Sequence, residues 1–244
     1  MTVYQPEGIL NRNLRLDGYR EEFERNARVR IADVLDREFA EEVYACFGRT
    51  PWRVTFRQSN EIVSMLGKEF HSLSQTERNE LRGKIYAETL RGYQFCYLHM
   101  PLLHDKSRAW DEKQVVPALH SLINSSAFLD LGRTVSGVSE IDRADSVATC
   151  YTRDSFLTAH PDAPIDDRLV AYVFSFTKEW KADWGGLLQF FDGENGKIVD
   201  SLIPAFNALT LFRVPQWHSV SIVTPFAMGP RFSVTGWFRG GASS

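Results

Sequence analysis

Residues 168–176 read RLVAYVFSF, a short run dominated by β-branched and aromatic residues. Such a composition favours an extended strand over a helix. Four further runs of the same kind surround it: VATCYT at 147–152, GLLQFF at 186–191, NALTLFRV at 207–214 and RFSVTGWF at 231–238. Turn-forming residues separate them, namely DGENG at 192–196 and Pro204, Pro215, Pro225 and Pro230. From about residue 146 onward, the pattern predicts a β-sandwich or jelly roll.

The preceding region, residues 36–131, has a mostly helical character. Asp36 is placed to cap a helix whose apolar residues recur every four positions and which stops at Gly48. Ser74 and Glu77 form a capping box that starts a helix running to about Gly92. Apolar residues also recur at helical spacing over 113–131, and PWRVTFRQ at 51–58 predicts one additional strand.

No repeat, low-complexity segment or long linker divides the chain. We therefore expect a single domain over residues 1–244, with a mostly helical support region over about 30–145 and a β-structured core over about 146–240. The helices are expected to pack on one outer face of the major sheet, because that face needs an apolar cover.

Composition excludes several classes of function. The net charge of −3 provides no basic field, so no direct nucleic-acid partner is expected. No apolar run approaches the ~20 residues of a membrane span, and the first thirty residues lack the apolar core of a signal peptide. Cys46, Cys96 and Cys150 are widely separated and flanked by apolar residues, which predicts reduced, buried thiols in a cytoplasmic protein.

The stretch LTAHPDAP at 157–164 carries the first candidate for chemistry. In an extended chain the side chains at positions i and i+2 point the same way, and Pro161 biases His160 away from the helical region. We therefore expect His160 and Asp162 to project onto one side of the chain, a few ångströms apart. Taken alone, the pair is equally compatible with a loop ion pair.

His218, in PQWHSV at 215–220, is the candidate third member of this group. Two neutral imidazoles and one carboxylate occupy one face of an octahedral ferrous ion and leave three positions open for oxygen chemistry. A packed core histidine is the alternative for His218.

Arg231 and Ser233 open the last predicted strand, two positions apart and hence on one face. A guanidinium fork binds a carboxylate in bidentate fashion and stays charged when buried. A dicarboxylic cosubstrate is therefore suited to chelating the metal at one end and pairing with Arg231 at the other. The alternatives are a surface arginine and an ordinary strand serine.

The ordered set of HPD, GGLLQFF, SLIPAFNALTLFRV, WHSVSIV and RFSVTGWF resembles the prolyl-4-hydroxylase-like branch of the 2-oxoglutarate- and Fe(II)-dependent oxygenases. Within that branch it is most similar to the subgroup of ribosomal-protein prolyl hydroxylases. The resemblance is specific over about 146–239. It implies a mainly β fold with flanking helices, a double-stranded β-helix (jelly roll) whose N-terminal helices lie on the outer face of the major sheet.

The resemblance also implies an activity and its residues. The expected reaction is hydroxylation of a prolyl residue in a protein or peptide, using Fe(II), O2 and 2-oxoglutarate, with release of succinate and CO2 and with ascorbate as the reductant. By position, His160, Asp162 and His218 match the iron ligands, and Arg231 matches the residue that binds the distal carboxylate. Tyr151 matches a tyrosine that lines the 2-oxoglutarate pocket, although it is equally well explained as a strand aromatic.

One position departs from the family pattern. Ser175 stands where close relatives usually have a tyrosine that hydrogen-bonds 2-oxoglutarate, and its hydroxyl is too short for the same contact without a water. Cosubstrate binding is therefore expected to be weaker or rearranged. His71, His99, His104 and His120 are expected to be structural or exposed, and Trp237 and Phe238 are given no special role.

Two alternatives to the protein hydroxylase stay open. One keeps the chemistry and replaces the protein substrate with a free amino acid or small metabolite. The other is a non-catalytic jelly-roll module that binds ligands as a sensor or scaffold. The sequence does not identify the substrate, the position of hydroxylation on a proline ring or the oligomeric state.

Overall fold

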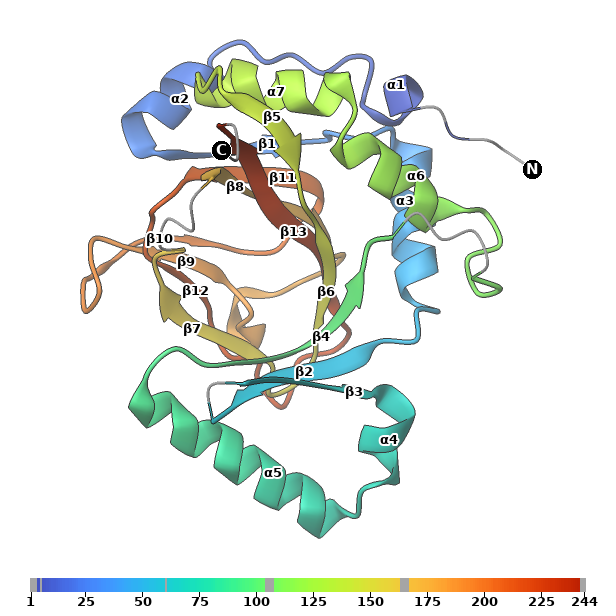
Figure 1. Ribbon diagram of the computed structural model, residues 1–244, viewed down its shortest axis with the longest axis vertical. Helices are drawn as coiled ribbons and strands as arrows, with labels where there is room; N and C mark the ends of the chain where they lie inside the picture. The colour runs from blue at the N-terminus through green and yellow to red at the C-terminus, as the bar shows by residue number, and fades with distance from the viewer. Residues whose placement is uncertain (1–3, 5, 60, 104–107, 163–166, 242–244) are drawn as a thin grey trace.

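The computed structural model describes residues 4, 6–59, 61–103, 108–162 and 167–241. Across these residues the strands join into one mostly antiparallel sheet that curls into a half-barrel (Figure 1). In sheet order the strands are β1 (Arg28–Ala32), β11 (Phe206–Arg213), β8 (Arg168–Phe176), β13 (Arg231–Gly240), β6 (Val147–Tyr151), β4 (Phe95–Pro101), β7 (Phe156–His160), β12 (His218–Val220), β9 (Leu188–Phe191) and β10 (Ile198–Leu202). The expected mainly β jelly roll is confirmed.

Three further strands extend this sheet at its sides. β2 (Arg53–Gln58) pairs with β4 and with β3 (Glu61–Leu66), while β5 (Ile141–Ala144) pairs with β13. Each of the six predicted strand segments contains a strand, including the one expected at 51–58. Strands β1, β3, β4, β5, β7, β10 and β12 were not predicted.

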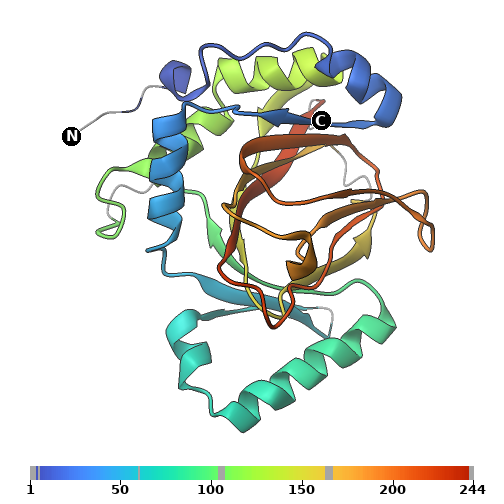
Figure 2. The same cartoon turned by 180° about the vertical axis from the view of Figure 1, so that it is seen from behind.

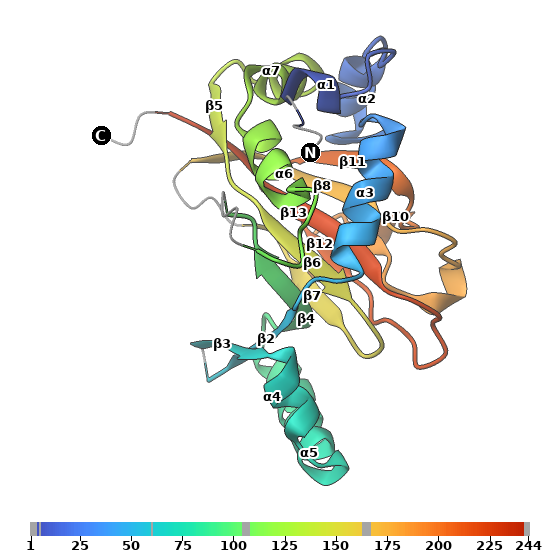
Figure 3. The ribbon, with the colours of Figure 1, turned by 90° about the vertical axis from the view of Figure 1, so that its right-hand side faces the viewer.

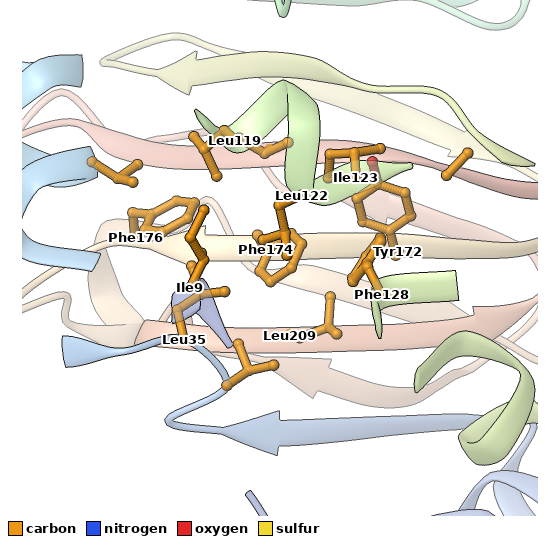
Figure 4. Close-up of a cluster of buried hydrophobic side chains, with 14 of the residues drawn as sticks. Ile9, Leu35, Leu119, Leu122, Ile123, Phe128, Tyr172, Phe174, Phe176 and Leu209 are labelled. Carbon is orange, nitrogen blue, oxygen red and sulfur yellow. The ribbon is translucent and has the colours of Figure 1, made fainter. Parts of the chain in front are cut away.

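Alternation along the central strands separates the helix-covered face of the sheet from the inside of the half-barrel. Tyr172, Phe174 and Phe176 of β8 are buried against helices, whereas Ala171 and Val173 line the interior cavity. Figure 4 shows the three aromatic rings in one row beneath α6 (Val115–Ile123), which contributes Leu119, Leu122 and Ile123. This row anchors the central strands and frees their opposite face for function.

Five helices cover the outer face, as expected: α1 (Pro6–Ile9), α2 (Tyr19–Asn26), α3 (Arg37–Phe47), α6 and α7 (Ser126–Ser136) (Figures 1 and 2). α3 begins where predicted, because Phe39 N donates to the Asp36 carboxylate at 3.1 Å, and it ends at Gly48. The helix predicted over 113–131 is two helices. The Ser125 hydroxyl accepts from Phe128 N and caps the start of α7. The apolar spacing continues across this boundary and therefore did not reveal it.

The remaining helices do not cover the major sheet, and there the expectation was wrong. α4 (Gly67–Ser72) and α5 (Gln75–Glu88) pack beside β2, β3 and β4, at the opposite end of the molecule from α7 (Figure 3). The predicted capping box is present, since Glu77 N donates to Ser74 Oγ at 3.2 Å and Ser74 N donates to Glu77 Oε2 at 2.7 Å. The short 3-10 helix η1 (Thr89–Arg91) continues α5 to Gly92, as expected.

Strand β4 ties the first half of the chain into the β core. It lies between β6 and β7, with Leu98 opposite Cys150 and Phe95 opposite Leu157. Apolar or aromatic residues lie on both faces of β4, since Phe95 and Tyr97 line the interior cavity while Cys96 and Leu98 pack with the cluster beneath α5, so its sequence FCYLHMP shows no alternation and gave no strand signal. The single-domain arrangement remains a prediction, although the sheet draws strands from both regions.

Gly185 and Gly186 lie between the short 3-10 helix η2 (Ala182–Trp184) and β9. Both residues have positive φ, 67° and 62°, which other residues rarely adopt. A Cβ on Gly185 would lie 1.9 Å from the carbonyl oxygen of Ile222, and one on Gly186 would lie 3.3 Å from Arg231 Cδ. The pair therefore lets the chain pass close to the arginine singled out by the sequence.

Two expectations from composition can be compared with the structure. Cys46 and Cys150 are buried, Cys96 is partly buried, and all three are free thiols, as predicted. Among the described residues, no helix has the length and apolar content needed to cross a membrane.

Candidate active site

The two candidate histidines meet through the register of a strand pair. His160 is the last residue of β7, His218 is the first of β12, and the ladder places them directly opposite each other. Their ring centres are 4.2 Å apart. Antiparallel pairing therefore brings together two imidazoles that lie far apart in the sequence.

Hydrogen bonds to main-chain carbonyls fix the tautomer of both rings. His160 Nδ1 lies 3.0 Å from Thr158 O, and His218 Nδ1 lies 2.7 Å from Gln216 O. Because a carbonyl oxygen only accepts, each Nδ1 carries a proton, and in a neutral ring this leaves Nε2 with the lone pair that can bind a metal. Burial lowers the pKa of His218 to about 4, which keeps this imidazole neutral at physiological pH.

Asp162 joins the histidines, but not through the extended chain that the sequence suggested. Its φ is 47°, in the left-handed region that costs an ordinary residue ~1–2 kcal/mol and that aspartate tolerates better than most. The carboxylate still faces the rings, as expected: Oδ1 lies 3.4 Å from His160 Nε2 and Oδ2 lies 3.7 Å from His218 Nε2. The predicted convergence is confirmed: His160 is in an extended strand, as expected, whereas Asp162 itself is not extended.

The Asp162 carboxylate is ionised in this setting. Burial acts to raise its pKa, but the contacts with His160 and His218 and the hydrogen bond from the Trp237 indole outweigh burial and lower it below the usual value. One ligand atom from each of His160, Asp162 and His218 lies within 4.8 Å of the others. Within the described part of the chain, no other group of three His, Cys, Asp or Glu side chains is placed to hold a metal. Two neutral nitrogens and one carboxylate suit a ferrous ion.

The three ligands open into a cavity of about 670 Å³ inside the half-barrel. Tyr93 and Arg57 lie at its mouth, where the Tyr93 ring centre is 4.8 Å from that of His160 and the Arg57 guanidinium carbon is 5.6 Å from that of Tyr93. Arg231, Tyr151 and Thr149 line its deep end.

Arg231 is buried at the deep end without a counter-charge among the described residues. Arg231 is 3% exposed, and its Nε has no hydrogen-bond partner among the described residues. The guanidinium carbon lies 4.8 Å from the centre of the Tyr151 ring, and burial lowers the pKa of the guanidinium. A buried cation in this position calls for an anionic ligand, because an unpaired buried charge is costly.

Three hydroxyls lie beside Arg231 and share its lack of partners. Ser233 of β13 is opposite Thr149 of β6 on one side and Ser175 of β8 on the other. All three residues are buried, and none of the three hydroxyl oxygens has a hydrogen-bond partner within the described chain. We call Thr149, Ser233 and Ser175 the hydroxyl row. The row and Arg231 together fit the distal carboxylate of a small diacid, which accepts hydrogen bonds from both kinds of donor.

Thr149 and Trp237 are among the residues of the site that the sequence analysis missed. Thr149 lies two positions before Tyr151, hence on the same face of β6, and this spacing was a usable signal. The dismissal of Trp237 was wrong. Its indole Nε1 donates to Asp162 Oδ2 at 2.9 Å, a contact that bridges distant parts of the chain and leaves no local pattern.

The other histidines fall outside this cluster. His99 Nε2 is 3.0 Å from Ser64 Oγ, His71 is exposed on α4, and His120 is half-buried on α6. His104, also expected to be structural or exposed, lies outside the described residues.

Comparison with known proteins identifies one domain within the chain. Residues 146–239 match the model of the 2OG-Fe(II) oxygenase superfamily. These residues form a 2OG-Fe(II) oxygenase domain. The resemblance stated from the sequence is thereby confirmed, over the segment where it was specific.

The curated relatives are prolyl hydroxylases. The chain is 31% identical over 129 residues to prolyl 3-hydroxylase OGFOD1 of Mus musculus, which covers 49% of this chain and 23% of that protein. It is 31% identical over 122 residues to the protein of the same name from Xenopus laevis, covering 46% and 24%. The chain thus spans about a quarter of the length of these relatives.

Solved structures share the fold of the oxygenase domain. A prolyl-4-hydroxylase from Pseudomonas putida superposes with a TM-score of 0.57 and 17% identity, covering 93% of this chain and 99% of that one. A prolyl hydroxylase from Trichoplax adhaerens, solved with a peptide fragment of the hypoxia-inducible factor oxygen degradation domain, gives 0.59 and 18%, covering 92% and 89%. At these identities the likeness concerns the fold.

Proposed function

We propose that this chain is a dioxygenase that hydroxylates a prolyl residue of a protein, dependent on Fe(II) and 2-oxoglutarate, with release of succinate and CO2. One observation carries the proposal: a single cavity holds two imidazoles and a carboxylate at one end, and a buried arginine with the unpaired hydroxyl of Thr149 at the other. An oxygen-activating ferrous ion and a chelating diacid need this pairing of ends.

Each residue has a distinct role in the proposal. His160 Nε2, His218 Nε2 and the Asp162 carboxylate would hold the ferrous ion, which supplies oxygen activation and electron transfer when bound. Arg231 and Ser233 would bind the distal carboxylate of 2-oxoglutarate and fix its direction in the cavity. Tyr151 would close the side of the pocket, since its ring lies against the Arg231 guanidinium and burial raises its phenol pKa well above normal.

The choice of a prolyl substrate rests on the curated relatives, which carry the name prolyl 3-hydroxylase. The mouth supplies an aromatic wall against which an apolar ring can pack, formed by Tyr93 and Trp237, with the 70% exposed Ile62 beside it. The curated relatives carry position 3 of the proline ring in their name, whereas the solved neighbour from Pseudomonas putida carries position 4.

Two finer points belong to the same proposal. Ascorbate would serve as the reductant that keeps the iron ferrous. A cytoplasmic location is supported by three free cysteines, two of them buried, because such thiols persist in a reducing compartment.

The decisive experiment supplies the purified chain with Fe(II), ascorbate and 2-oxoglutarate, and measures succinate with and without a proteome-derived peptide library. We expect slow succinate release alone, faster release with the right peptides, and the mass of one added oxygen on a proline. The Asp162→Ala variant is the matched inactive control.

The outcomes separate the alternatives. Failure to bind 2-oxoglutarate in the presence of Mn(II) would favour a binding module without turnover. Succinate formation stimulated by a small metabolite, with no peptide modified, would favour the metabolite oxygenase.

A further inference from the structure

The three candidate ligands are held in different ways. His160 and His218 lie in paired strands, and their Nδ1 atoms are bonded to main-chain carbonyls. Asp162 lies beyond the end of β7 in a left-handed conformation. Gln216 N donates to Pro161 O at 3.0 Å, which fixes the chain just before Asp162 but does not set the direction of its side chain.

The direction of that side chain is set by Trp237. The indole Nε1 donates to Asp162 Oδ2 at 2.9 Å, while Oδ1 is the oxygen nearer to His160 Nε2, at 3.4 Å. An indole N–H is a donor only and does not change its protonation at working pH. Oδ2 therefore accepts from the indole although it also lies 3.7 Å from His218 Nε2, whereas Oδ1 accepts no such hydrogen bond and lies nearest to His160 Nε2.

The indole is itself held from several sides. The Arg168 guanidinium carbon lies 3.7 Å from the centre of the Trp237 ring, and Arg168 Nη1 lies 3.8 Å from Asp162 Oδ1. The main chain of Trp237 is paired with Asp145, since its N donates to Asp145 Oδ1 at 2.9 Å and its O accepts from Asp145 N at 3.2 Å. Rotation of the indole would break the stack on Arg168, so the donor stays aimed at the carboxylate.

We propose that Trp237, braced by Arg168, is a positioning residue that makes Asp162 a ligand through one oxygen. The inference rests on the proposed metal site. Three protein ligand atoms leave three positions of an octahedral ion open, whereas a carboxylate bound through both oxygens would take one of them. Two open positions serve a chelating 2-oxoacid, and the third serves oxygen.

The test measures metal binding rather than turnover. Trp237→Phe keeps the ring and removes the donor, so the full chain should bind Mn(II) about ten- to a hundredfold more weakly, the usual effect of losing a hydrogen bond to a metal ligand. Free Mn(II) is followed by electron paramagnetic resonance, and the Co(II) absorption spectrum reports a changed coordination number. Trp52→Phe is the matched control, because Trp52 Nε1 donates to Phe47 O at 3.0 Å, away from the ligand cluster, and should leave Mn(II) affinity unchanged.

A second variant covers the case in which Trp237→Phe fails to fold. Arg168→Lys keeps the charge near Asp162 and loses the flat stack on the indole, so it should weaken Mn(II) binding several-fold. The inference would be overturned if a folded Trp237→Phe protein kept the wild-type Mn(II) affinity and an unchanged Co(II) spectrum. If only Arg168→Lys folds, the same result in that variant would overturn it. Wild-type chain that binds no Mn(II) would instead overturn the proposed function.

Discussion

The two ends of the cavity differ in how their polar atoms are paired. At the metal end, both imidazole Nδ1 atoms and one Asp162 oxygen have protein partners at 2.7–3.0 Å. At the deep end, Arg231 Nε and the hydroxyl row have no partner among the described residues. The metal end is organised by the chain itself, whereas the deep end is built to be completed by a ligand.

This difference has an energetic consequence. A buried hydroxyl left without a partner costs ~1–3 kcal/mol, and a buried guanidinium left without an anion costs more. The deep end therefore lowers the stability of the free protein, and a diacid bound there should raise the melting temperature more than the metal does alone.

The largest expected effect comes from breaking the metal end. Asp162→Ala removes the anionic ligand and should abolish both succinate formation and Mn(II) binding at concentrations that saturate the wild type. Far-UV circular dichroism should stay unchanged, because the sheet does not depend on this side chain. The exposed carboxylate of Glu80 on α5 provides the control variant, Glu80→Ala, and an Asp162→Ala protein that retained activity would show the ligands to be misassigned.

Breaking the deep end should separate cosubstrate binding from metal binding. Arg231→Ala should weaken 2-oxoglutarate binding by ~3–5 kcal/mol, the cost of breaking a buried charge pair, while Mn(II) affinity stays the same. The ligand-free variant should melt no lower than the wild type, since an unpaired buried cation has been removed. Calorimetric titration of Mn(II)-loaded protein measures the first effect, and an unchanged 2-oxoglutarate affinity would remove Arg231 from the pocket.

Acid should weaken the metal-free protein through His218. Its pKa is about 4 in the folded chain against a usual value near 6.5, so the unfolded chain binds more protons between these values. The free energy of unfolding should therefore fall as the pH drops from about 6.5 towards 4, by up to ~3 kcal/mol. Urea titrations across this range measure the slope. His218→Gln should flatten it, and a slope unaffected by that change would argue against a buried neutral imidazole.

The smallest effects should come from the hydroxyl row. Thr149→Val and Ser175→Ala should each weaken 2-oxoglutarate binding by ~0.5–1.5 kcal/mol and leave the stability of the free protein equal or higher. Thr55→Val is the contrasting control, because the Thr55 hydroxyl already donates to Val63 O at 3.1 Å. Thr55→Val should lower the free energy of unfolding without changing 2-oxoglutarate affinity. If Thr149→Val and Ser175→Ala lowered stability and left 2-oxoglutarate affinity unchanged, the hydroxyl row would bind no ligand.

What the sequence predicted, and what it missed, follows from the range of the interactions involved. The long strands β8, β11 and β13 are rich in β-branched and aromatic residues, so they were predictable. His160, Asp162, His218, Arg231 and Ser233 were found because their spacing forms a pattern. Strand β12 has only three residues, too few to show a periodicity. Strand β4 has apolar or aromatic residues on both faces, so its sequence does not alternate. Trp237 was missed because its partner, Asp162, lies across the barrel, and Asp162's left-handed turn has no signature in HPD.

Strand β4 limits what can be cut from this protein. It joins β6 to β7 although it lies some fifty residues before the segment that the family model covers. An excised fragment of residues 146–239 would leave two open strand edges at that seam, exposed to pairing with other chains. The segment matched by the family model is therefore not expected to fold by itself. A version transferred to another protein would need to include β4.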